Sequence, residues 1–241
     1  MLLKTVLITV IIAVSALIQS SLGIGFAMFA EPTISVLLRD PVTTAAVVSI
    51  GIAAMNLQHS IETRRHINMK MALPPMLGVT VGKILGIAAL MRVDTSAAMT
   101  GLGILLIVFA AYFCFFGNRV RIRPTLFKGV IFGLAAGFLG GMFNLTGPMA
   151  AIYFYSATED RFEYNASLNF AFLPSALIGL GMHIAYGNLN AEMLPIGVCA
   201  LIASFFGVKY GLRILNKIDR AQLSKILYIY MTVMGVVLLV L

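Results

Sequence analysis

The stretch "GGMFNLTGPMA", residues 140–150, interrupts a sequence that is otherwise strongly apolar. It contains three glycines together with Asn144, Thr146 and Pro148. Proline lacks an amide hydrogen and glycine gains little from helix formation, so both residues weaken a continuous helix. The stretch therefore predicts a helix that stops inside the apolar region, with a second segment beginning directly after it.

The composition of the chain is that of a membrane protein. Of its 241 residues, 60% are hydrophobic and 11% are charged, and the mean hydropathy is +0.99. A soluble domain carries roughly 25% charged residues. The net charge of +8 comes from basic residues in short loops, which is typical of membrane topology and not of nucleic-acid binding. We predict an all-α polytopic membrane protein in a lipid bilayer, with no nucleic-acid partner.

Apolar runs of about 18 or more residues span a bilayer as helices, and shorter runs do not. Residues 1–16 resemble a signal peptide, but apolar sequence continues behind them, which favours a first membrane helix. Segments 23–38 and 145–157 are short and each contains a proline, so they are predicted to be broken or re-entrant, giving 8–10 transmembrane segments. The ten predicted segments are 4–22, 23–38, 41–60, 71–91, 97–116, 129–143, 145–157, 162–186, 191–212 and 222–241.

The two sets of five segments resemble each other. When Pro32 is aligned with Pro148, Gly25 falls on Gly141, and at nearby offsets Gly86 falls on Gly207 and Asp94 on Asp219. The order of features therefore predicts a duplication within one transmembrane domain, residues 1–241. Repeat one is 1–117, a basic connector is 118–128, and repeat two is 129–241.

Loop charge indicates that the repeats are inverted. The basic stretches at 62–70 and 117–128 are expected in the cytoplasm. The second-half counterpart of 62–70 has no basic residue, whereas 213–225 carries four. An odd number of crossings in each repeat produces this switch, with the short segments crossing or forming hairpins with their neighbours. The alternative has eight spans with re-entrant loops that do not cross, and it would place 213–225 outside.

The break at 140–150 has a counterpart in the first half, "SSLGIGFAMFAEP" at 20–32. Breaks in inverted-repeat transporters lie near the midplane, and their half-helix N-termini face anionic substrate groups. The other reading is a glycine-rich packing seam between helices. Two breaks at matching positions favour a substrate-binding site formed by Gly25, Gly141, Asn144, Thr146 and Pro148.

Lys83 lies deep in an apolar segment, where a buried charge is costly and marks a functional site. It is expected to hold an anion or to pair with Glu31, the acid that lies well inside an apolar run. If Glu31 instead faces the cavity, it is a candidate carrier of a coupling proton.

Further polar residues in the apolar runs are candidates for the substrate site and its pathway. Gln19, Ser20 and Ser21 precede the first break, and Asn165 and Asn169 lie one helical turn apart; we assign these five to the substrate site. Asn56 and His59 share a helix face and are assigned to the pathway or to coupling, whereas His66 and His183 near segment ends are expected to be structural. The sequence contains no motif of a metal site, cofactor site or catalytic nucleophile, so no enzyme activity is expected.

The chain resembles the TauE/SafE family of sulfite and organosulfonate exporters, also called the toluenesulfonate uptake permease family. The resemblance covers nearly the whole chain and is carried chiefly by residues 64–90, 133–155 and 182–198. The sequence departs from the family pattern at Asn144 and Thr146, where glycine is common in the family, and its first signature keeps only two glycines.

The resemblance implies export of small sulfur-containing anions, such as sulfite or organosulfonates, across a bacterial inner membrane. We expect alternating access coupled to H⁺ or Na⁺, without a cofactor. An anion channel, a transporter of another small organic anion such as a carboxylate, and an intramembrane assembly factor are the alternatives.

Overall fold

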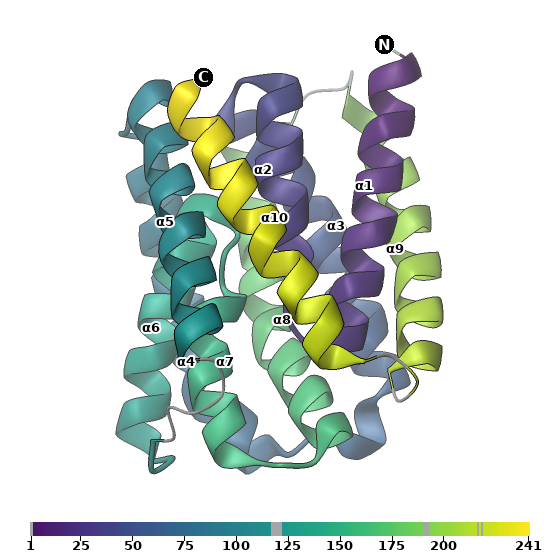
Figure 1. The fold of residues 1–241 in the computed structure, drawn as a ribbon, viewed down its shortest axis with the longest axis vertical. Helices are drawn as coiled ribbons and strands as arrows, with labels where there is room; N and C mark the ends of the chain where they lie inside the picture. Colours follow the sequence, from purple (N-terminus) through teal and green to yellow (C-terminus); the bar gives the residue numbers. More distant parts are fainter. Residues whose placement is uncertain (1, 117–121, 190–192, 216, 218) are drawn as a thin grey trace.

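The computed structural model describes residues 2–116, 122–189, 193–215, 217 and 219–241. These residues form ten α-helices and one 3₁₀ turn, η1, at Arg64–His66. Eight of the helices, all but α2 and α7, are long and apolar enough to cross a membrane, which confirms the predicted fold class. The helices are α1 (Leu2–Leu22), α2 (Phe26–Leu38), α3 (Pro41–Glu62), α4 (Met69–Leu90), α5 (Thr95–Phe115), α6 (Leu126–Phe143), α7 (Gly147–Ala157), α8 (Arg161–Ala185), α9 (Leu194–Ile214) and α10 (Arg220–Val240) (Figure 1).

Polar capping residues set where most of these helices begin. The side chains of Asp40, Asn68, Asp94, Asp160 and Asp219 each accept a hydrogen bond from an amide N–H in the turn that follows. Such caps satisfy amide groups that have no partner within the helix. The observed helices therefore begin within a few residues of the predicted segments.

The start of α6 differs from the prediction. Thr125 caps this helix by accepting a hydrogen bond from the Lys128 amide, so α6 begins at Leu126, inside the stretch predicted as connector 118–128. Residues 117–121 of that connector lie outside the described residues.

The two short helices, α2 and α7, form hairpins with α1 and α6 and are too short to cross the membrane by themselves. With 13 and 11 residues, α2 and α7 are about 20 and 16 Å long, against a hydrocarbon core of about 30 Å. In Figure 1, α1 leaves the end of the bundle where the N-terminus lies and α2 returns to it, whereas α6 and α7 form the same hairpin from the opposite end. The short segments thus pair with their neighbours as hairpins, and the choice between this arrangement and eight spans with re-entrant loops stays a prediction.

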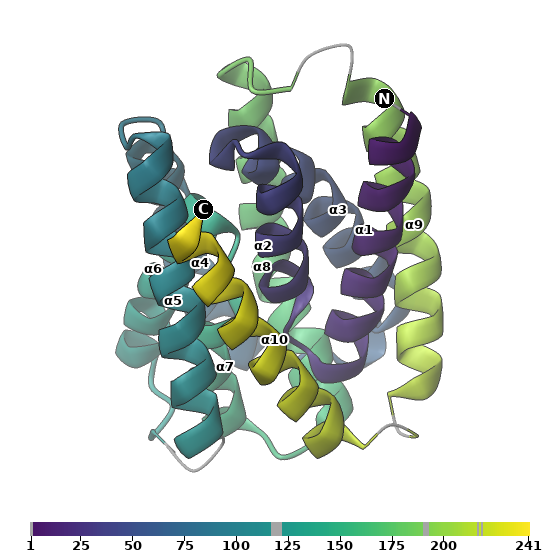
Figure 2. The ribbon, with the colours of Figure 1, turned by 45° about the horizontal axis from the view of Figure 1, so that its top comes forward.

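Helices of one predicted half pack on helices of the other half in a regular order. The first helix of each half packs along the fourth helix of the other, as α1 with α9 and α6 with α4. The third helices, α3 and α8, pack on each other, and so do the fifth, α5 and α10, which run in opposite directions in Figures 1 and 2. An inverted repeat would give this order, and both the inverted repeat and its boundaries remain predictions.

Helices α4 and α6 are in backbone contact along a seam of glycines, three on each helix at intervals of four residues. A Cβ atom added at Gly82 would lie 2.2 Å from the Leu134 carbonyl oxygen, and one at Gly137 would lie 2.2 Å from that of Val79. Small residues at this spacing let membrane helices approach closely. The packing seam and the helix break are therefore both present, and the break follows directly after the seam. The seam glycines are Gly78, Gly82, Gly86, Gly133, Gly137 and Gly141.

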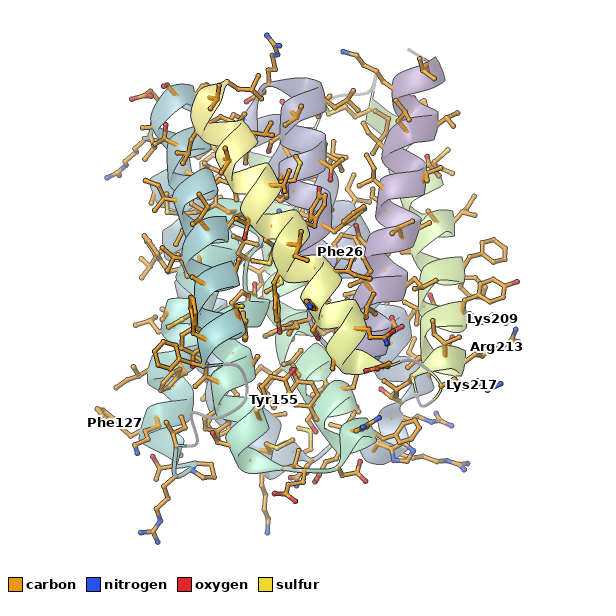
Figure 3. All side chains as sticks on the ribbon, in the orientation of Figure 1. Phe26, Phe127, Tyr155, Lys209, Arg213 and Lys217 are labelled. Carbon is orange, nitrogen blue, oxygen red and sulfur yellow. The ribbon has the colours of Figure 1, made fainter. Side chains whose placement is uncertain are left out.

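Basic residues gather at one end of the bundle. Figure 3 places Phe127, Arg213 and Lys217 toward the end opposite the N-terminus. The basic turn between α3 and α4 lies at the same end, because α3 runs away from the N-terminal end (Figure 1). The positive-inside rule predicts that this end faces the cytoplasm. Both ends of the chain lie at the other end of the bundle in Figure 1, which is then predicted to be the outer end.

Because the seam leaves no space for a side chain, adding one methyl group to a seam glycine is expected to lower the stability of the protein. Gly137→Ala is expected to destabilise the protein by about 1–3 kcal/mol or more, because the new Cβ meets backbone that cannot rotate away. The measurement is thermal unfolding in detergent. Gly101→Ala on α5 is the control, since its nearest neighbour, Phe143 Cζ, would be 3.5 Å away. Equal melting temperatures for the two variants would show that α4 and α6 are not in contact.

Candidate functional site

A small buried cavity of about 20 Å³ lies where the two hairpins meet. A cavity of this size holds about one water molecule. Both hairpins contribute to its wall, together with α3, α4 and α8. The lining residues are Gln19, Gly25, Ala27, Met28, Ile52, Asn56, Lys83, Asn144, Leu145, Thr146, Gly147, Pro148, Phe172, Ser175 and Ala176.

The first helix break ends in a side-chain cap. After α1, the backbone at Gly25 has a φ of 126°, which an L-residue with a side chain rarely adopts. The Gln19 Oε1 atom then accepts a hydrogen bond from the Phe26 amide at 3.1 Å, and its Nε2 atom donates to Asn169 Oδ1 at 2.9 Å. Figure 3 places Phe26 near mid-height of the bundle, so α2 begins inside the protein.

The second break depends on a left-handed residue. Asn144 ends α6 with a φ of 55°, and its amide donates to the Gly140 carbonyl at 2.9 Å. After glycine, asparagine is among the residues that adopt this conformation most readily. Pro148 then lies in the first turn of α7, where a missing amide hydrogen costs nothing. Asparagine can therefore stand at 144 without changing the backbone.

The Lys83 side chain reaches this second break. Lys83 is only 3% exposed, and its Nζ atom donates to the Gly140 carbonyl at 2.5 Å and to Asn144 Oδ1 at 2.7 Å. Gly179 on α8 leaves room for it, because a Cβ there would lie 2.6 Å from Lys83 Cε. An ammonium group has three N–H donors, so one is left for a ligand.

The expected pairing of Lys83 with Glu31 is indirect. Asn144 stands between the two groups: its Oδ1 accepts from Lys83, and its Nδ2 donates to Glu31 Oε2 at 3.1 Å. The same Nδ2 donates to the Ala45 carbonyl at 3.1 Å. An ammonium can only donate and a carboxylate can only accept, so the orientation of the Asn144 amide is fixed by its neighbours.

Asn56 presents a free amide to the cavity. Asn56 is fully buried on α3, and neither its Oδ1 nor its Nδ2 has a hydrogen-bond partner among the described residues. A buried polar group without a partner costs about 1–3 kcal/mol. An unpaired amide that lines a cavity therefore indicates a position where a ligand or water completes the bonding.

The electrostatics of the cavity favour an anion. The first turns of α2 and α7 both lie in its wall, at Ala27 and Met28 and at Gly147. The leading amide N–H groups of a helix have no partner within it and carry partial positive charge. Two helix N-termini, the Lys83 ammonium and the Asn56 amide thus converge on one small space.

The predicted site residues fall into two groups. Seven of them line the cavity, namely Gln19, Gly25, Asn56, Lys83, Asn144, Thr146 and Pro148. The others do not line it, and their roles in binding or coupling remain predictions; they are Ser20, Ser21, Glu31, His59, Gly141, Asn165 and Asn169.

Three residues of the second group, Ser20, Asn165 and Asn169, support the first break. Asn165 Nδ2 donates to the Ser20 carbonyl at 2.8 Å, and Asn165 Oδ1 accepts from Asn169 Nδ2 at 2.7 Å. Asn169 in turn holds Gln19, so this network joins α8 to the cap of α2. The Ser21 hydroxyl donates to the Leu17 carbonyl within α1 at 2.7 Å.

Several groups at the site were not predicted. The carbonyls of Gly140 and Ala45 are backbone acceptors, which leave no trace in a sequence. Ser175 lines the cavity but donates to the Phe172 carbonyl at 2.8 Å, as a serine in any apolar helix can.

A family model described as sulfite exporter TauE/SafE matches residues 7–238 of the chain. The protein belongs to the TauE/SafE sulfite exporter family and is a multi-pass membrane transporter of that family, not an enzyme. The comparisons with curated proteins and with solved structures found no match.

The two roles of Asn144 can be separated by substitution. Asn144→Gly keeps the left-handed backbone but removes the bridge between Lys83 and Glu31, with an expected loss of about 1–3 kcal/mol of stability. Asn144→Ala removes the bridge and adds about 1–2 kcal/mol of backbone strain. Thermal unfolding of both variants gives the comparison. A wild-type melting temperature for Asn144→Gly would mean that the bridge contributes nothing.

Proposed function

We propose that the central cavity binds a small sulfur-containing oxyanion, such as sulfite or an organosulfonate, and that the protein exports it from the bacterial cytoplasm. The observation that carries this proposal is the convergence of two helix N-termini with Lys83 and Asn56 on one buried cavity. Because the chain belongs to a sulfite exporter family, sulfite and related sulfur-containing anions are the first candidate substrates.

The cavity supports a carrier over a continuous pore. Its volume of about 20 Å³ suits a single water molecule, so an oxyanion with several heavy atoms enters only if the surrounding helices move. In alternating access, one half rocks against the other around the substrate site.

Glu31 gives the proposal a route to proton coupling. Its carboxylate is separated from Lys83 by the Asn144 amide alone. An anion in the cavity is attracted by Lys83 and repelled by ionised Glu31, since charges interact strongly in a low-dielectric interior. A proton taken up by Glu31 removes that repulsion, so anion and proton are proposed to move together. Na⁺ at the unwound carbonyls is the competing coupling ion.

Binding is tested on purified protein by the shift in melting temperature with sulfite, taurine and acetate. A ligand at 100 times its Kd stabilises the folded state by about 2.7 kcal/mol. The wild type is expected to be stabilised by sulfite or taurine, and Asn56→Leu and Lys83→Met are expected to lose most of the shift. Gln58→Ala, on another face of α3, serves as the control. Stabilisation by acetate alone would redirect the proposal to carboxylates.

Transport is tested in proteoliposomes with labelled anion under imposed pH or Na⁺ gradients. Wild-type counterflow is expected to saturate and to respond to the pH gradient, and Glu31→Gln is expected to retain exchange while losing that response. A response to Na⁺ alone would remove the proton from the proposal. Single-channel currents would replace the carrier with a channel.

A further inference from the structure

Helix α3 carries a buried polar stripe that leads from the cavity toward the cytoplasmic end. Asn56, His59, Ser60 and Thr63 are spaced so that they share one helical face, and each is at most 6% exposed. The opposite face is lipid-type surface, with Leu57 46% exposed. The stripe begins at the cavity with Asn56 and ends next to the basic turn η1.

This stripe is poorly satisfied in the present conformation. In the described ranges of the chain, the Asn56 amide, the His59 Nε2 atom and the Ser60 hydroxyl all lack hydrogen-bond partners. Leaving so many buried polar groups unpaired is costly, and native proteins rarely do so without a reason. Contact with water or with a polar solute in another conformation supplies that reason.

Helix α8 carries a similar face, which leads from the cavity toward the opposite end of the bundle. Ala176 lines the cavity, Gly179 lies against Lys83, and His183 follows one turn later in the last turn of the helix. His183 is fully buried, and its Nε2 atom has no partner within the part of the chain that the structure describes, whereas the neighbouring Ile184 is 59% exposed. Because α8 runs opposite to α3, His183 lies toward the outer end (Figure 1).

The two histidines occupy matching places. Each lies in the last turn of the third helix of its half, α3 or α8, and each of these helices begins with an aspartate cap. The two helices also pack on each other. A buried histidine with a free Nε2 therefore stands on each side of the central cavity.

Their hydrogen bonds assign the free nitrogen atoms. The Asn188 Nδ2 atom lies 3.1 Å from His183 Nδ1 and can only donate, so the neutral His183 ring keeps its proton on Nε2 as a donor. The Thr63 hydroxyl donates to the His59 carbonyl at 2.7 Å, so toward His59 Nδ1, at 3.3 Å, it acts as the acceptor. The free Nε2 of neutral His59 is then an acceptor, suited to a water molecule or to the hydroxyl of a protonated oxyanion.

We propose that α3 and α8 each line half of the permeation route, with His59 on the cytoplasmic half and His183 on the outer half, both closed in this conformation. The proposal rests on the proposed function, since it takes the cavity as the substrate site. It adds the route on each side of the cavity and the residue that the anion and its water meet there.

The test is side-specific labelling of single cysteines in the full chain, with Cys114 and Cys199 replaced by serine. His59→Cys is compared with Leu57→Cys, and His183→Cys with Ile184→Cys, so each control is a lipid-facing neighbour on the same helix. The reagent is sulfonatoethyl methanethiosulfonate, which does not cross membranes. It is added to inverted vesicles to reach the cytoplasmic side and to spheroplasts to reach the outer side.

A thiol reacts as the thiolate, which forms in water and not in lipid. His59→Cys is expected to react at least about tenfold faster than its control in inverted vesicles only, and His183→Cys likewise in spheroplasts only. Sulfite or taurine, whichever stabilises the wild type, is expected to slow both reactions. Labelling no faster than the controls, or labelling of both cysteines from one side, overturns the proposal.

Size-exclusion chromatography checks that each variant is folded, and Ser60→Cys against Ile61→Cys repeats the cytoplasmic comparison without replacing a histidine. The outcome is separable from that of the proposed function. If an anion stabilises the protein but the cysteines do not react faster than their controls, the binding site stands and the proposed route along α3 and α8 is wrong. If the cysteines react but no anion stabilises the protein, a water-filled route along α3 and α8 stands and the proposed substrate is wrong.

Discussion

The close contact between α4 and α6 is the constraint on which the rest of the site depends. Each seam glycine faces a backbone carbonyl of the other helix, so neither helix can shift without a clash. This contact delivers Lys83 of α4 to the end of α6, where the Gly140 carbonyl and Asn144 receive its ammonium. Without it, a lysine in an apolar helix would be a buried charge with no partner, which membranes seldom tolerate.

Asn144 connects the α4–α6 contact to the hairpin formed by α1 and α2. Its left-handed backbone ends α6, and its amide joins the ammonium of Lys83 to the carboxylate of Glu31 on the other hairpin. Asn144 thus stands between the Lys83 ammonium on α4 and the Glu31 carboxylate on α2, which do not touch each other directly. Because the bridge is a pair of hydrogen bonds, an anion or a proton can alter it without breaking the fold.

The sequence allowed the helices, the two breaks and the burial of Lys83 to be predicted, because proline, glycine and an intramembrane charge carry strong local signals. It did not allow the partner of Lys83 to be predicted correctly, since the Asn144 bridge depends on how α4 packs against α6. The sequence analysis favoured a binding site over a packing seam, whereas the structure contains a seam as well: Gly137 lies in the seam, and Asn144, seven residues later, lines the cavity. Asn165 and Asn169 had the polarity of ligands, but their hydrogen bonds hold the cap of α2.

The central claim is that both helix breaks share one anion. The most direct measurement is an experimental structure with selenite, the heavier analogue of sulfite, whose selenium atom is located by anomalous scattering. The account predicts one peak between the first turns of α2 and α7, within hydrogen-bonding reach of Asn56 and Lys83. A peak elsewhere in the protein, or no peak in the cavity at a saturating selenite concentration, would contradict it.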